Sequence, residues 1–139
     1  MRVLGFSQDW PKLQNEIFTT FRFARKDRDW QIGEYVQIVF RPRSPQRESL
    51  GIAQIIAKEP RRMAKYGRNW EGDDKVALIS ESEAIADGFA AECPGCGQRE
   101  IAYSQMWEWL FPIYGLRLLR EPMNKLTLKW ISKEHRKRL

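Results

Sequence analysis

The segment from Ser80 to Phe89 constrains the fold most, because its residues mark both ends of one short helix. The Ser80 hydroxyl can accept a hydrogen bond from the Glu83 N–H, and the Glu83 carboxylate can accept one from the Ser80 N–H, which is the reciprocal pattern of a capping box. Gly88 supplies the left-handed residue that ends such a helix. A helix this short is marginal alone, so it must pack on another part of the chain, with Phe89 as an apolar anchor.

Alternating apolar residues predict short strands around this helix. The first runs from Ile17 to Phe23 and places Thr20 and Arg22 on one face. In a later strand, Gly51 allows a close approach of two backbones. The predicted strands are 17–23, 35–40, 50–56, 76–79 and 126–131.

The connections carry most of the charge. Two prolines make Arg41–Pro45 a basic hairpin loop, since proline cannot donate to a sheet ladder. Lys58–Asp74 is predicted to be a long polar loop. A second helix is expected from Ser104 to Tyr114, with Trp107 on its buried side. These elements predict an α+β fold, a small mixed β-barrel with short helices packed at its side.

Composition bounds the class of protein. With 139 residues, 42% of them hydrophobic, the chain is expected to form one domain, residues 1–139, with a core at about 17–131 and a basic C-terminal tail at 132–139. No signal peptide or membrane-spanning run is recognised, and two neighbouring cysteines predict a reducing, cytoplasmic location. We expect no membrane partner and no cofactor.

The net charge of +6 is unevenly distributed. Basic residues cluster at 22–28, 41–47 and 61–68 and in the tail, whereas acidic residues concentrate between Glu71 and Glu92. A chain with this pattern can present one positive face to a polyanion such as nucleic acid. The alternative is ordinary solvated surface charge.

Five segments, taken in order, resemble the ASCH domain of the PUA-like superfamily. They are Thr19–Arg22, Trp30–Glu34, Leu50–Ala53, Glu83–Phe89 and Lys125–Ile131, and the resemblance covers roughly residues 17–131. It implies a curved barrel that packs against helices and leaves a nucleotide-sized cleft for RNA. Carried over to this sequence, the resemblance implies a cleft lined by Thr20 and Arg22, with an opposing wall that contains Glu83, Asp87 and Phe89.

Some members of this family resemble ribonucleases or amidohydrolases that act on modified nucleosides. The amidohydrolase-like members carry a lysine three residues before the threonine, where this chain has Ile17. An apolar side chain cannot act as a base or nucleophile. The resemblance therefore favours RNA binding without catalytic residues, with hydrolysis as the alternative.

The binding hypothesis assigns phosphate contacts to basic residues and base stacking to Trp70 and Tyr66. Alternatively, Arg22 pairs with Glu83 or Asp87 and the basic loops are merely solvated. The residues assigned to nucleic-acid binding are Thr20, Arg22, Arg25, Lys26, Arg41, Arg43, Arg47, Arg61, Arg62, Lys65, Arg68 and Trp70.

Cys93 and Cys96, in the segment Cys-Pro-Gly-Cys-Gly, have the spacing of half a zinc site. The only histidine is His135, so a complete site would have to be shared across a dimer. The alternative is a simple turn without metal. A third class of function, a protein–protein adaptor, would use this segment together with the Trp-rich second helix. In that helix, Trp109 is either exposed near the cleft or packed in the core.

Overall fold

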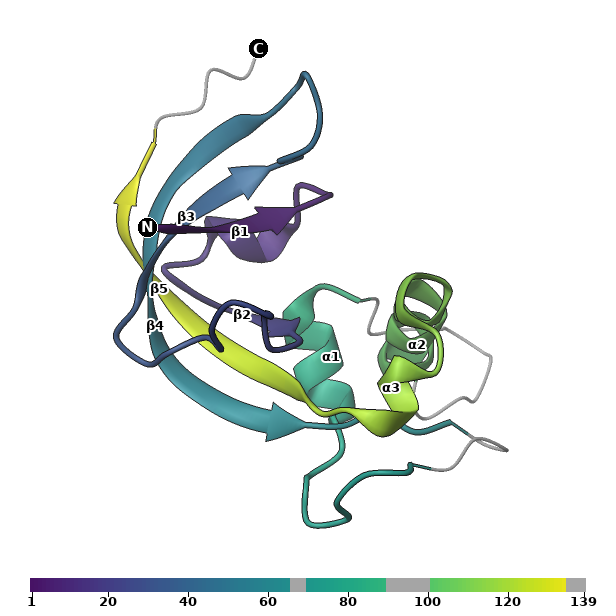
Figure 1. Cartoon of the computed structure of the whole chain (residues 1–139). Helices are drawn as coiled ribbons and strands as arrows, with labels where there is room; N and C mark the ends of the chain where they lie inside the picture. Colours follow the sequence, from purple (N-terminus) through teal and green to yellow (C-terminus); the bar gives the residue numbers. More distant parts are fainter. Residues whose placement is uncertain (66–69, 90–100, 135–139) are drawn as a thin grey trace.

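The computed structural model describes residues 1–65, 70–89 and 101–134 and shows an α+β fold built on one strongly curved sheet (Figure 1). The sheet has five strands in the order β1-β3-β4-β5-β2 and forms a half-barrel. Strands β1 and β3 are parallel and the other neighbours are antiparallel. In chain order, the elements are β1 (Arg2–Phe6), η1 (Pro11–Gln14), β2 (Ile17–Arg22), β3 (Tyr35–Phe40), β4 (Glu48–Arg61), α1 (Glu81–Asp87), α2 (Ile101–Tyr114), α3 (Arg117–Arg120) and β5 (Met123–Lys133).

The long pair β4 and β5 gives the sheet its curvature. Their register shifts twice, once between Ile52 and Ala53 and once between Ile55 and Ala57, and such irregularities bend a strand. At Gly51, φ is 132°, and a Cβ there would lie 2.1 Å from the Ser132 carbonyl oxygen. Only glycine tolerates this approach, as the sequence predicted.

Strand β2 takes part in two separate cores. Its inner face places Phe18 in the barrel interior, where Val36, Ile38, Leu126 and Leu128 are almost completely buried. Its outer face is covered by the helices, so that Phe21 belongs to a second core. That second core also contains Phe23, Met63, Ile79, Ala84, Met106, Trp107, Leu118 and Met123.

Helix α1 has the predicted ends. The Glu83 N–H donates to Ser80 Oγ over 3.1 Å, the Ser80 N–H donates to Glu83 Oε1 over 2.9 Å, and Gly88 has a φ of 121°. The Glu81 carboxylate accepts the N–H groups of Ala102 and Tyr103 in the first turn of α2. It therefore joins the start of α1 to the start of α2.

Helix α2 begins before the predicted Ser104 and retains Pro112 within its last turn. Trp107 is buried with 3% of its surface exposed, as predicted, and its ring stacks on Phe111. In the described part of the chain, no helix has both the length and the apolar character needed to cross a membrane.

Two predictions about the middle of the chain were wrong. Lys58–Arg61 belongs to β4 rather than to a loop. Pro60 is tolerated because this end of β4 pairs with β5 while its pairing with β3 stops at Gln54, so its missing N–H disrupts no ladder on that side. The predicted strand Val76–Ile79 is reduced to one bridge, between Arg62 and Leu78. Strand β1 and helix α3 were not predicted.

Candidate functional site

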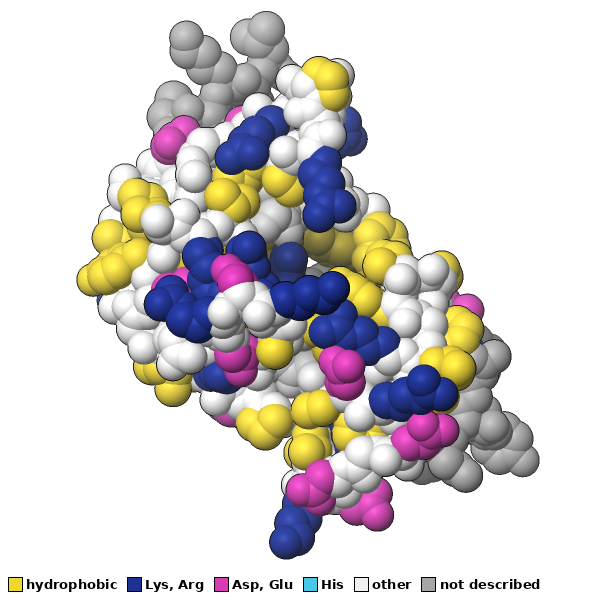
Figure 2. Space-filling model, in the orientation of Figure 1, with side chains coloured by type: hydrophobic (Ala, Val, Ile, Leu, Met, Phe, Trp, Pro, Cys, Tyr) yellow, Lys and Arg dark blue, Asp and Glu magenta, His cyan; other side chains and the backbone are white. Residues whose placement is uncertain are grey.

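A pocket of about 800 Å³ opens between the first two strands, the β3–β4 loop and the helices. The space-filling view shows a hollow on this face with Lys and Arg side chains beside it (Figure 2). Its walls come from β1, η1, β2, the loop 41–44, the end of α1 and the second half of α2. The pocket therefore lies where the open edges of the half-barrel face the helices.

One wall is cationic. Arg22, at the end of β2, donates from a terminal nitrogen to the Gly5 carbonyl oxygen of β1 over 2.7 Å and from Nε to Thr20 Oγ1 over 3.2 Å. Its guanidinium carbon lies 4.7 Å from the centroid of the Phe6 ring. Burial lowers the pKa of Arg22, although the nearby Tyr114 and Asp87 oppose this shift. Arg22 thus links the two edge strands and fixes a positive charge in the pocket.

The β3–β4 loop adds two more cations to this wall. A Cβ on Gly5 would lie 2.5 Å from Pro42 Cγ, so the glycine lets the loop pack directly on β1. This contact brings the exposed side chains of Arg41 and Arg43 to the rim of the pocket. Neither arginine belongs to any ion pair among the described residues.

A buried ion pair forms part of the pocket lining. Lys12 Nζ of η1 donates to Asp87 Oδ1 of α1 over 2.6 Å, and the two side chains are only 6% and 12% exposed. Lys12 Nζ also lies 5.4 Å from the centroid of Phe6 and 5.8 Å from that of Trp10. Burial lowers the pKa of Lys12 and Arg22 lowers it further, while Asp87 acts in the opposite direction.

The opposite wall is aromatic. Trp10 lies 5.4 Å from Phe89 and 5.7 Å from Trp109, measured between ring centroids, and Phe89 lies 6.4 Å from Trp109. The helix-ending Gly88 makes room for this cluster, because a Cβ there would lie 2.5 Å from Trp10 Cε3. Trp109 remains 37% exposed, so part of an indole is open to a ligand.

The pocket collects about half of the residues expected to line the binding site. Asp87 lies in it but bonds to Lys12, and Arg22 forms no ion pair with Asp87 or Glu83 within the described residues. The expected residues that line the pocket are Thr20, Arg22, Arg25, Arg41, Arg43, Asp87 and Phe89.

The other described candidates lie elsewhere. Glu83 is not in the pocket wall: its carboxylate accepts hydrogen bonds from Arg61 and pairs with Lys125. Burial would raise the pKa of Glu83, but the hydrogen bonds from Lys125 and from the Ser80 N–H, with the charges of Lys125 and Arg61, lower it overall. Arg47 lies in the same loop as Arg43 but outside the pocket.

The basic residues after β4 also bind within the protein rather than at the pocket. Lys65 pairs with Glu108, and Arg62 donates to the Val76 carbonyl oxygen over 2.7 Å while its guanidinium lies 5.8 Å from the Trp70 ring. Trp70 is half-buried, and its buried indole nitrogen has no hydrogen-bond acceptor in the described part of the chain. Tyr66, Arg68, Cys93, Cys96 and His135 lie outside the described residues.

Lys12, Trp10 and Phe6 are among the pocket residues that the sequence analysis missed. Lys12 carries no local signal, because its partner Asp87 is 75 positions away. The pairing of Pro11 with a following lysine indicates only a turn.

Comparisons with protein-family models, with curated proteins and with solved structures found no significant match to this chain.

Proposed function

We propose that this protein is an ASCH-type, PUA-like domain that binds single-stranded RNA and holds one nucleotide in the pocket. The observation that carries this proposal is the pairing of two walls in one cavity. Arg22, Arg41 and Arg43 supply positive charge on one side, and the Trp10–Phe89–Trp109 cluster supplies ring faces and edges on the other. A nucleotide has the same two parts, an anionic phosphate and a flat base.

The two walls can contribute separately to affinity. Arginine binds phosphate through two parallel N–H groups, and the exposed guanidinium groups of Arg41 and Arg43 need break no ion pair within the described residues to do so. Stacking of a base on an aromatic side chain contributes about 1–3 kcal/mol. The half-open indole of Trp109 is the surface available for that contact.

The test measures fluorescence anisotropy of a labelled single-stranded RNA over a series of salt concentrations. The double variant Arg41→Ala/Arg43→Ala should weaken binding and reduce the salt slope by about 0.7 for each phosphate that the protein no longer neutralises. Arg47→Ala is the matched control, because Arg47 is an exposed arginine of the same loop that lies outside the pocket. Trp109→Ala should weaken binding while leaving the salt slope unchanged.

Two results would contradict the proposal. One is the absence of RNA binding by the unaltered protein at low salt. The other is a loss of binding free energy in Arg47→Ala that is half of the loss in the double variant, which would show that only the total charge of the loop matters.

A second candidate function is hydrolysis of a modified nucleoside in the same pocket. The observation that favours it is Lys12, a buried amine with a lowered pKa that lines the pocket together with Thr20. Although residue 17 is isoleucine, the pocket therefore contains an amine from another element. Purified protein incubated with acylated cytidine and with labelled RNA distinguishes the two functions: turnover that disappears in Lys12→Met supports hydrolysis, and binding without turnover supports the first proposal.

A further inference from the structure

A second groove, of about 700 Å³, lies next to the pocket. It is formed by the segment that follows β2 and by the short helix α3. Arg25 lines both the pocket and this groove, so the two hollows meet at one side chain. The other residues of the groove are Ala24, Lys26, Asp27, Arg117 and Glu121.

Aromatic contacts support the same continuity. Tyr114 of the pocket wall lies 4.9 Å from Phe23, measured between ring centroids, and the guanidinium carbon of Arg117 lies 4.1 Å from the Phe23 centroid. The buried ring of Phe23 thus contacts both Tyr114 of the pocket and Arg117 of the groove. In Figure 2, Lys and Arg side chains extend from the hollow across this face of the molecule.

The cations of the groove are available to an external anion. Two of the cations form ion pairs: Arg25 Nε lies 3.3 Å from Asp27 Oδ1, and Arg117 Nε lies 2.8 Å from Glu121 Oε2. All four side chains are more than 40% exposed. Exposed pairs of this kind contribute little to stability, so a phosphate can replace the carboxylate at small cost. Lys26 is exposed and forms no ion pair with any described residue.

We propose that this groove binds the phosphate next to the nucleotide held in the pocket, so that the strand passes over Arg25 from one hollow to the other. The inference rests on the proposed function and makes it more specific. The ligand is then a single strand of at least two nucleotides, and Lys26 contacts its backbone outside the pocket.

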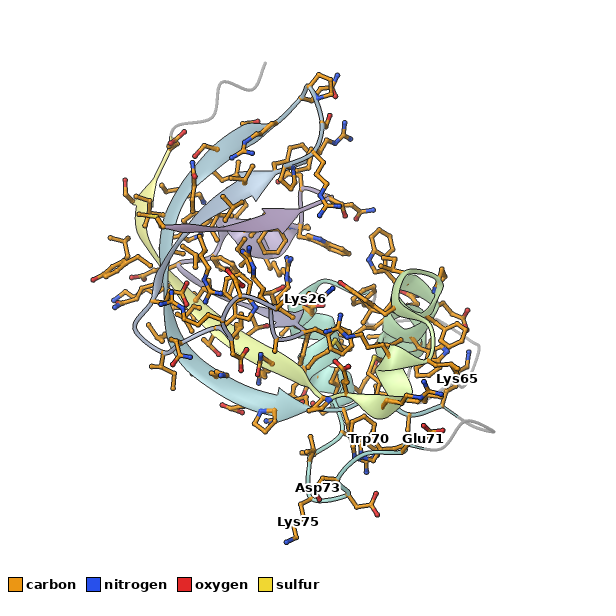
Figure 3. The ribbon with its side chains drawn as sticks, viewed as in Figure 1. Lys26, Lys65, Trp70, Glu71, Asp73 and Lys75 are labelled. Atoms are coloured by element: carbon orange, nitrogen blue, oxygen red, sulfur yellow. The ribbon has the colours of Figure 1, made fainter. Side chains whose placement is uncertain are left out.

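The experiment compares ligands of increasing length, from one uridine nucleotide to a hexamer, for the unaltered protein and for Lys26→Ala. The structure supplies a matched control in Lys75→Ala, which removes the same charge from an exposed residue on a distant loop (Figure 3). Affinity should rise several-fold between the single nucleotide and the short oligomers. Lys26→Ala should remove most of that gain and lower the salt slope for oligomers by about 0.7, the value expected for one phosphate contact.

The outcomes separate the two proposals. If the hexamer binds but no tighter than the single nucleotide, or if Lys26→Ala and Lys75→Ala behave alike, the groove is not part of the site and the pocket proposal stands. If no ligand of any length binds, the proposed function itself is wrong. Loss of single-nucleotide binding in Lys26→Ala would also contradict the assignment, because Lys26 lies outside the pocket.

Discussion

Replacing Asp87 by asparagine tests whether the ion pair in the pocket is as isolated from water as its geometry indicates. The change keeps the shape of the side chain but removes the charge 2.6 Å from Lys12 Nζ. The lysine ammonium, only 6% exposed, would then remain among Phe6, Trp10 and the positive Arg22. Removing one partner of a buried pair typically costs about 3–5 kcal/mol. We expect a loss near the lower value, because the asparagine oxygen can still accept a hydrogen bond.

The loss should depend on pH. Without Asp87, burial lowers the pKa of Lys12 in the folded variant further below the ordinary value of 10.5. Between the folded and unfolded pKa values, the unfolded chain binds more protons, so the stability of the variant rises with pH. Each unit of difference between the two pKa values corresponds to about 1.4 kcal/mol. The gap between variant and unaltered protein should therefore narrow from pH 7 towards pH 10.

Urea denaturation followed by tryptophan fluorescence measures these free energies. The double variant Lys12→Met/Asp87→Leu is the control, because replacing both charges by apolar groups of similar size should restore most of the lost stability. Two outcomes would refute the reasoning: a loss in Asp87→Asn below about 0.5 kcal/mol, the range of ordinary surface substitutions, or a larger loss that does not change with pH.

Two further predictions concern stability. Gly88→Ala should lower the free energy of unfolding by more than the roughly 1–2 kcal/mol of a left-handed alanine, because the new Cβ would also lie 2.5 Å from Trp10. Gly33 has a φ of 90° and open space around it, so Gly33→Ala measures the backbone cost alone. Equal losses of stability in the two variants, measured by thermal denaturation, would disprove the Trp10 contact. The hydrogen bond from Arg2 lowers the pKa of Glu34 in the folded protein, and burial opposes this shift. The pair therefore stabilises the fold fully at a pH above the ordinary glutamate pKa of 4.5, and this stabilisation is lost as the pH falls through the lower pKa of the folded state. Glu34→Gln should therefore flatten the acid limb of the stability–pH curve, and an unchanged limb would contradict this.

Short-range patterns in the sequence predicted the parts of the fold whose causes are local. The capping box of α1 and the end of that helix at Gly88 each depend on a few neighbouring residues, and both were confirmed. The close approach at Gly51 was confirmed as well, although the sequence did not indicate that its partner is Ser132 of β5. The end of β4 was missed because a proline such as Pro60 normally indicates a loop. Here Pro60 removes no hydrogen bond between strands, because β3 no longer pairs with this part of β4.

The pocket could be predicted only in part for a related reason. Thr20 and Arg22 share a strand face, which alternation shows directly. Lys12 pairs with Asp87 of α1, 75 positions away, and Trp10 packs against Phe89. A periodic pattern of residues cannot predict a contact between such distant positions. The partner of Asp87 was therefore beyond the reach of local patterns, and so was the pairing of Glu83 with Lys125.

The placement of β2 beside β5 has a consequence for how the protein is made. Ile17 lies opposite Lys129 and Arg22 opposite Asn124, so β2 finds its strand partner only when nearly all of the described chain has been synthesised. Contacts between such distant residues slow folding. Until then, Phe18 lacks the β5 residues Leu126 and Leu128 of its core, and exposed apolar segments of this kind favour aggregation. A ribosome that stalled before β5 would therefore release a chain that has every residue lining the pocket but lacks the strand that holds β2 in the sheet.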